Sequence, residues 1–172
     1  MNTLTRSGQV SIAALRVVIG WVFLYAGLEK IFGAEPFSAA GFLQFGTAGT
    51  APGAVEGAIV NPTQAFWVDL ASNLGAMGVI DVLVPFGQVA IGAALILGLV
   101  TRFAGAMGFL MMSFITIAAW DFAFGIVNYT AVLAVAALLL GIMRAGEIYG
   151  VDAIIDEQPV VKRTPALRYV LG

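Results

Sequence analysis

Long uncharged stretches dominate the hydrophobic pattern of this chain. Three of them lie between the charged residues Asp81, Arg102, Asp121 and Arg144. A helix needs roughly 20 mainly apolar residues to cross the hydrocarbon core of a bilayer. The apolar residues surround these segments on all sides, whereas a soluble amphipathic helix has one apolar stripe. The pattern therefore predicts spanning helices at about 81–100, 103–121 and 127–144.

A further hydrophobic segment, 12–32, contains Arg16 and the pair Glu29 and Lys30. A basic residue followed by an apolar run is also typical of a secretory signal peptide. Arg16 interrupts this run, however, and no small-x-small cleavage site follows it cleanly. We therefore expect a retained spanning helix at about 12–32, with a cleaved signal peptide as the alternative.

The connection after this segment, 33–79, is long, rich in Gly, Ala and Pro, and contains no Lys or Arg. Asn61 and Pro62 match an N-cap followed by proline at the first helical position, and Gly75 is expected to end that helix. A second short piece, Pro36–Phe45, is also expected at the membrane surface. In the short helix that begins at Asn61 and Pro62, the apolar positions share one side: Phe66, Trp67, Leu70 and Leu74. This pattern predicts an interfacial helix and not a fifth span.

Basic residues predict the orientation, because cytoplasmic loops carry an excess of Lys and Arg. Arg6 precedes the first span, Arg102 lies between the second and third, and four basic residues from Arg144 onward follow the fourth. Both ends are thus predicted to be cytoplasmic, in a multi-pass protein of the cell membrane. The predicted fold is all-α: a four-helix transmembrane domain over 1–152 with an outer loop at 33–79, and a cytoplasmic tail at 153–172. The whole stretch Ala145–Gly172 is expected to be solvated.

Small and polar residues at heptad spacing predict the seams of this bundle, since small residues let helices approach closely. In the first helix these are Arg16, Gly20, Phe23, Gly27 and Lys30, and in the second Asp81, Pro85, Gln88, Gly92 and Leu95.

Composition narrows the chemistry. The chain is 60% hydrophobic and 10% charged, and it contains no Cys and no His. Thiolate catalysis, Fe–S clusters, bis-His haem and the usual zinc sites are therefore excluded, and no metal site is predicted. The net charge of −2 and the absence of a basic stripe exclude electrostatic nucleic-acid binding. Redox chemistry would need a bound organic cofactor or a partner subunit.

The predicted topology gathers polar residues at the outer helix ends and so predicts a pocket that opens outward. Charges at membrane depth cost at least about 2.5 kcal/mol, so they are candidates for function. The candidate ligand-binding residues are Tyr25, Glu29, Lys30, Asp81, Gln88, Trp120, Asp121 and Asn128. For the deeper Gln88 we favour an interhelical hydrogen bond over a ligand contact. Glu29 and Lys30 can equally form a solvated helix end, and Trp120 an interfacial belt.

Three arginines, Arg16, Arg102 and Arg144, are interpreted as topology determinants whose side chains snorkel toward the bilayer surface. No catalytic residue is assigned.

Glycine and arginine placements in the apolar helices carry a family resemblance. The matching positions are Leu15, Arg16, Gly20, Phe23, Leu24, Gly27, Lys30, the run 92–102 and the stretch 146–152. With these the chain resembles the DoxX family, which includes the small subunit of thiosulfate:quinone oxidoreductase. The resemblance implies a four-helix membrane protein associated with oxidoreductase or redox-linked complexes.

Two functions from different classes stay open. The first is a membrane oxidoreductase subunit that binds a quinone between helices and takes electrons from a donor or partner. The second is a non-catalytic accessory or assembly subunit that packs against a larger membrane protein complex. Besides the lipid bilayer, the expected partners are other membrane protein subunits or a second copy of the chain. A passive pocket for a solute or lipid is a third reading. The sequence leaves open whether the chain is an enzyme.

Overall fold

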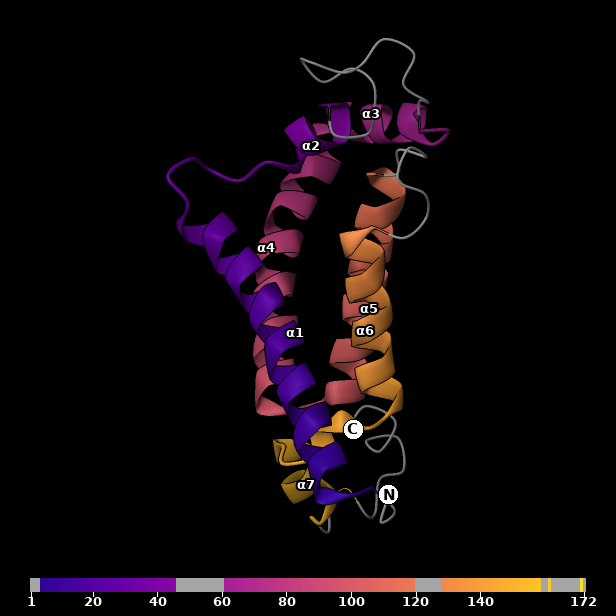
Figure 1. Ribbon diagram of the computed structural model, residues 1–172. Helices are drawn as coiled ribbons and strands as arrows, with labels where there is room; N and C mark the ends of the chain where they lie inside the picture. The colour runs from indigo at the N-terminus through magenta and orange to yellow at the C-terminus, as the bar shows by residue number, and fades with distance from the viewer. Residues whose placement is uncertain (1–3, 46–60, 120–127, 159–160, 162–170, 172) are drawn as a thin grey trace.

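The described part of the computed structural model, residues 4–45, 61–119, 128–158, 161 and 171, contains helices and no strands (Figure 1). In chain order the elements are α1 (Arg6–Phe32), α2 (Ala39–Phe45), α3 (Gln64–Ser72), α4 (Leu74–Leu97), α5 (Thr101–Ala118), α6 (Tyr129–Ile142), the 3-10 turn η1 (Ala145–Glu147) and α7 (Val151–Asp156). The four longest helices run along one axis, α2 and α3 lie across one end, and η1 and α7 lie at the other (Figure 1). We call these the cap end and the tail end.

Three helices, α1, α4 and α5, are long and apolar enough to cross a membrane. The prediction of a helical membrane protein is confirmed at this level. The fourth predicted span, 127–144, corresponds to α6, which is apolar but has only 14 residues.

The predicted boundary between the loop 33–79 and the span 81–100 is wrong. α4 begins at Leu74, because the Asn73 side chain accepts a hydrogen bond from the Ala76 amide (3.1 Å) and caps the helix there. Gly75, expected to end the preceding helix, is instead in the first turn of α4. Residues 46–60 of the predicted loop lie outside the described residues.

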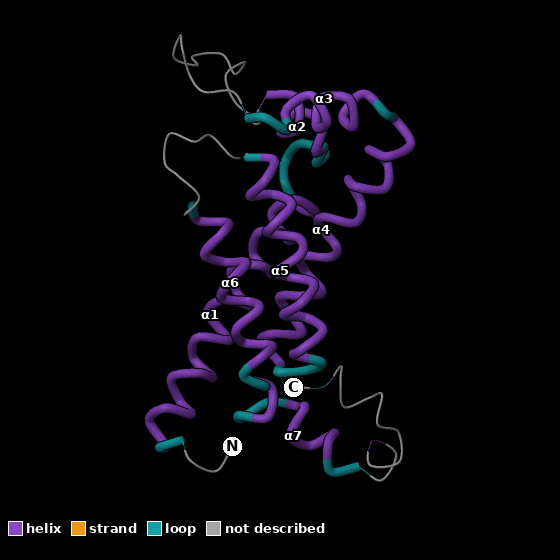
Figure 2. Tube along the Cα trace, turned by 90° about the vertical axis from the view of Figure 1, so that its right-hand side faces the viewer, coloured by secondary structure: helices purple, strands orange, loops and turns teal. Residues whose placement is uncertain are grey.

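Two close helix pairs form the bundle, α1 with α4 and α5 with α6 (Figures 1 and 2). A Cβ atom placed on Gly20 would lie 2.9 Å from the Gly92 carbonyl oxygen, and one on Gly105 would lie 2.5 Å from the Ala137 carbonyl oxygen. No real Cβ atom tolerates such distances, so glycine at these positions permits the pairing. The predicted seam residues Arg16, Gly20, Phe23 and Gly27 are buried.

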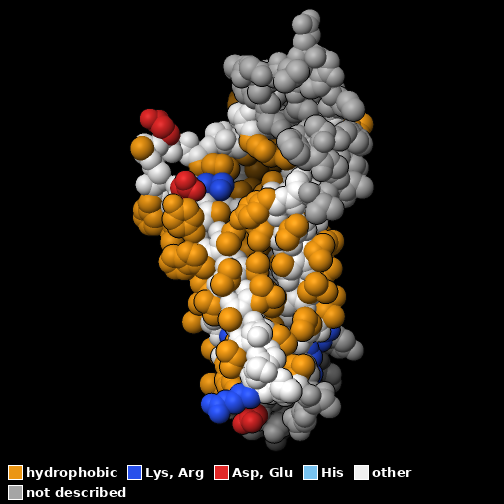
Figure 3. Space-filling model, viewed as in Figure 1, with side chains coloured by type: hydrophobic (Ala, Val, Ile, Leu, Met, Phe, Trp, Pro, Cys, Tyr) orange, Lys and Arg blue, Asp and Glu red, His pale blue; other side chains and the backbone are white. Residues whose placement is uncertain are grey.

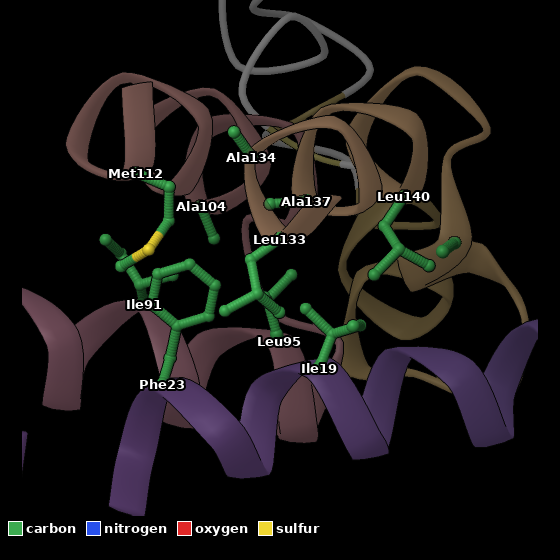
Figure 4. Close-up of a cluster of buried hydrophobic side chains, with 11 residues drawn as sticks. Ile19, Phe23, Ile91, Leu95, Ala104, Met112, Leu133, Ala134, Ala137 and Leu140 are labelled. Atoms are coloured by element: carbon green, nitrogen blue, oxygen red, sulfur yellow. The ribbon is translucent and has the colours of Figure 1, made fainter. Parts of the chain in front are cut away.

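The two pairs meet in an apolar core at mid-bundle (Figure 4). Its labelled side chains come from all four long helices and include Phe23, Ile91, Leu95, Met112 and Leu133. Toward the cap end, α1 tilts away from α5 and α6 (Figure 1). The tail end is therefore the more tightly closed end of the bundle.

The cap packs through a second apolar cluster, in which Trp67 and Ala71 of α3 lie with Leu43, Met77 and Ala118. The predicted apolar face of α3 is partly wrong, since Phe66 and Leu74 are exposed. The helix also starts later than predicted, with Thr63 at the N-cap position.

Asn61, which was expected to cap α3, accepts from the Thr63 amide through its Oδ1 (2.9 Å) and also binds the end of α5. Its Nδ2 donates to the carbonyl oxygens of Ile117 (2.8 Å) and Ala118 (3.0 Å). The last carbonyls of a helix lack partners within the helix, so this amide satisfies two of them. It thereby fastens the cap to α5.

Candidate functional site

Gln88 in α4 is the predicted site residue that the structure buries most deeply, with 3% of its surface exposed. Its amide oxygen has no hydrogen-bond partner among the described residues. The interhelical hydrogen bond that we favoured from the sequence is therefore absent there. Gln88 lies one turn from Ile91, which belongs to the bundle core, on the side toward the cap end.

Pro85 lies one turn beyond Gln88, inside α4. A proline in a helix lacks the N–H that would bond the carbonyl four residues earlier, here that of Asp81. α1 approaches closely at this level, since a Cβ atom on Gly27 would lie 2.7 Å from the Pro85 carbonyl oxygen. Gln88 therefore lies next to a turn of α4 that lacks one backbone hydrogen bond, at the α1 contact.

Lys30, in the last turn of α1, is half-buried. Its ammonium donates to the Ala26 carbonyl (3.1 Å) and lies 5.6 Å from the centre of the Phe37 ring. Within the described residues no carboxylate lies within ion-pair distance of it. Lys30 thus presents a positive charge with unused donor capacity near the cap end.

Two other predicted site residues serve helix ends. Asp81 Oδ1 accepts from the Ala39 amide (2.7 Å) at the start of α2, which ties α2 to α4. Asn128 caps α6, because its Oδ1 accepts from the Ala131 amide (2.9 Å). The same oxygen accepts from the Thr130 hydroxyl (2.8 Å). Both side chains therefore have a structural task.

Tyr25 and Glu29 of α1 are exposed, 59% in the case of Tyr25. No hydrogen bond or ion pair joins Glu29 or Lys30 to Asp81 in the described part of the chain. Contacts thus do not link the predicted residues into one cluster there. Trp120 and Asp121 lie outside the described residues.

Arg16 is buried at the tail end, with 2% of its surface exposed, and does not snorkel to a bilayer surface. Its Nη1 donates to the carbonyls of Ala145 and Ile148 (3.1 Å to Ile148), and its Nη2 to that of Tyr149 (3.4 Å). A guanidinium has five donors, so it can gather several carbonyls of one irregular segment. Arg16 thereby fastens the segment after α6 to α1.

Asp152 lies in the same buried layer and is fully buried. Its carboxylate accepts from the Val100 amide (2.7 Å) and the Thr101 amide (2.9 Å), at the start of α5. Asp152 also interacts electrostatically with Arg16. The expectation that Ala145–Gly172 is solvated is therefore wrong for its first part.

Glycines make room for this buried Arg16–Asp152 pair. Gly98 has φ +66°, and a Cβ atom on it would lie 2.6 Å from Arg16 Nη1. A Cβ atom on Gly146 would collide with the Asp152 carboxylate and the Thr101 hydroxyl. The stretch that contains Gly146, Gly150 and Asp152 contributed to the family resemblance. The sequence did not reveal that Asp152 lies in the same buried layer as Arg16.

The other two arginines lie near the same end. Arg102 is half-buried in the first turn of α5. Arg144, with φ 52°, forms an ion pair with Glu147. Neither placement tests their predicted role in topology.

A groove of about 700 Å³ opens at the tail end between α1, the end of α4 and α7. Among its lining groups, the Tyr149 hydroxyl donates to Gln9 Oε1 (3.5 Å), and Glu147 pairs with Arg144. These groups already bind one another, so we place no ligand there.

One of three comparisons with known proteins found a match. A search of curated proteins and a search of solved structures each found no match. The DoxX family model matches residues 11–121, which is more than half of the 172-residue chain. This range includes most of α1, the cap helices, α4 and α5, together with Arg16, Lys30 and Gln88. The chain belongs to the DoxX family.

Proposed function

We propose that this protein is the membrane subunit of a redox-linked complex and holds a quinone-type ligand between its helices near the cap end. In this proposal the chain crosses the bilayer four times, with the cap end outside and both termini in the cytoplasm. The sequence contains no Cys and no His, so a partner or a soluble donor supplies the electrons. A quinone bound there would carry them, and the chain's own residues would bind and orient its head group.

The observation that carries this proposal is the buried amide of Gln88, whose oxygen lacks a partner within the described residues. A buried polar group without a hydrogen bond costs about 1–3 kcal/mol, and native proteins seldom leave one. A bound head group would remove that cost. An amide has both a donor and an acceptor, so it matches a quinone carbonyl as well as a quinol hydroxyl.

The surroundings of Gln88 support an amphipathic, ring-shaped ligand. Ile91, one turn from Gln88 on α4, belongs to an apolar core that also contains Phe23 and Met112. In Figure 3 the surface is hollowed beneath the cap, where α1 diverges from α5 and α6. Lys30 is a cation at that end of α1 and would favour developing negative charge on a ligand oxygen. Small-molecule sites combine such apolar walls with few polar groups.

The test is binding of decyl-ubiquinone and of a naphthoquinone analogue to the purified protein in detergent, for the wild type and for Gln88→Leu. Loss of the amide should weaken binding about fivefold to tenfold, because one buried hydrogen bond contributes about 1–1.5 kcal/mol. Gln9→Leu, on α1 at the tail end, is the matched control and should bind like the wild type.

Thermal stability without ligand separates this role from a purely structural one. Since Gln88→Leu removes an unsatisfied buried group, the ligand-free variant should be at least as stable as the wild type. A destabilised variant with unchanged quinone affinity would mean that Gln88 serves packing alone. Wild-type protein that binds neither quinone would end the proposal, and binding of phospholipid in their place would favour the passive pocket.

An accessory or assembly subunit without a ligand is the second candidate. The exposed face of α1 favours it, because it carries the large aromatic side chains Trp21 and Tyr25, each 59% exposed.

A further inference from the structure

The side of α1 that faces away from the bundle carries a second row of residues at helix-packing spacing. We call it the α1 outer face. Val18, Trp21, Tyr25, Glu29 and Phe32 are all exposed and recur three or four residues apart. This spacing is the one found along helix–helix seams. Figure 3 shows large apolar side chains projecting along α1, with acidic side chains at its cap end.

Trp21 is at an unusual depth for an exposed tryptophan. Exposed Trp residues of membrane proteins gather at the bilayer surfaces, where the ring N–H finds a partner. Trp21 lies near the middle of α1 and is 59% exposed, and its N–H makes no hydrogen bond to any described residue. A hydrocarbon tail cannot accept a hydrogen bond, whereas a neighbouring helix can supply an oxygen.

Glu29 gives the face a chemical preference. The carboxylate is exposed and makes no ion pair within the described residues. Its neighbour Lys30 interacts with it electrostatically, but the Lys30 ammonium donates to the Ala26 carbonyl and lies over the Phe37 ring. Exposed aromatic rings lie one turn on either side of Glu29, at Tyr25 and Phe32. A carboxylate between aromatic rings is suited to bind an ammonium or guanidinium group.

The geometry points to one kind of occupant: we propose that the α1 outer face docks a transmembrane helix of a different membrane protein. That helix carries an Arg or Lys at the end that lies level with the cap end of this chain. A lipid head group would not extend from Glu29 to Trp21, which are about 12 Å apart along the helix at 1.5 Å per residue. A second copy of this chain is disfavoured because a two-fold axis would bring two Glu29 carboxylates together. The proposal uses other residues than the quinone site and does not depend on it.

The test is photo-cross-linking in the native membrane of the full chain with Tyr25→p-benzoylphenylalanine. Phe114→p-benzoylphenylalanine is the matched control, since Phe114 is an equally exposed aromatic residue on α5. We expect one specific protein adduct at position 25 and none at 114. Mass spectrometry of the adduct should locate the cross-link in a transmembrane helix of the partner that has a basic residue at the end level with the cap end of this chain.

Removing the negative charge of Glu29 is the second part of the test. Glu29→Gln, added to the cross-linking chain, should lower the adduct yield about tenfold, as expected from the loss of roughly 1.4 kcal/mol in a charge-assisted contact. Glu35→Gln, which changes an exposed acid outside α1, should leave the yield unchanged. Adducts with lipid or with a second copy, equal adducts at both positions, or equal yields for both Gln variants would each overturn the proposal.

Discussion

At the scale of single residues, the buried Arg16–Asp152 pair organises the tail end. Asp152 holds a turn in which Val100 has φ 44°, a conformation that a β-branched residue adopts only at a cost. Both backbone amides at the start of α5 bond to the carboxylate, which also interacts electrostatically with Arg16. The pair thus joins α1, the α4–α5 turn and α7 in one buried layer.

Replacing Asp152 with Asn should therefore lower the stability of the protein by about 2–3 kcal/mol. The amide nitrogen cannot accept a hydrogen bond, so one backbone N–H loses its partner, and the buried Arg16 loses the opposing charge. SDS-induced unfolding in mild detergent, followed by circular dichroism, measures the change. Asp69→Asn, at an exposed position on α3, is the control and should shift the unfolding midpoint little.

The role of Arg16 also marks a limit of sequence reasoning at this scale. Its acceptors are backbone carbonyls up to 133 positions away, and a carbonyl has no residue signature. A charged residue in an apolar run is equally compatible with snorkelling, which is the interpretation the sequence favoured. Gln88 has the same ambiguity, because an amide in a helix does not reveal whether a neighbour will reach it.

At the scale of elements, the sequence predicted the contact faces of the helices better than their ends. The seams were readable because close packing requires glycine, as at Gly20, Gly27 and Gly92, and glycine is otherwise costly in a helix. The start of α4 could not be predicted in this way, because the Gly and Asn residues around position 74 are typical of a loop. They become helical only through the Asn73 cap and the packing of Met77.

Gly92→Leu should separate α1 from α4 and lower stability by at least about 2 kcal/mol, at the upper part of the usual cost of overpacking. A Cβ atom at this position collides with the Leu24 backbone, which cannot move aside as a flexible side chain could. Gly78→Leu, on the same helix but with no atom within 4 Å of the added Cβ, is the matched control. Equal unfolding midpoints for the two variants would contradict the α1–α4 contact described above.

At the scale of the whole molecule, the fold consists of two helix pairs. The hydrogen bonds of buried Arg16 and Asp152 hold them together at the tail end, and α2 and α3 cover the cap end. The tail end contains buried hydrogen bonds between distant segments, whereas α1 tilts away from α5 and α6 toward the cap (Figure 1). Such an arrangement concentrates rigidity at the tail end. A ligand would meet least resistance near the cap, where the proposed site lies.

The proposed membrane orientation predicts where reagents can reach the chain. Among the described residues, Arg6, Arg102 and Arg144 lie at the tail end and only Lys30 is a basic residue near the cap, so the tail end should face the cytoplasm. Because the chain contains no Cys, single-cysteine variants give clean labelling. An impermeant maleimide on intact cells should label Glu35→Cys and Ser72→Cys, and Ser7→Cys and Glu157→Cys only after permeabilisation. The Glu157 variant is decisive for α6, whose 14 residues extend only about 21 Å at 1.5 Å per residue. Labelling of Glu157→Cys from outside would mean that α6 does not return the chain to the cytoplasm, and the four-crossing arrangement would be wrong.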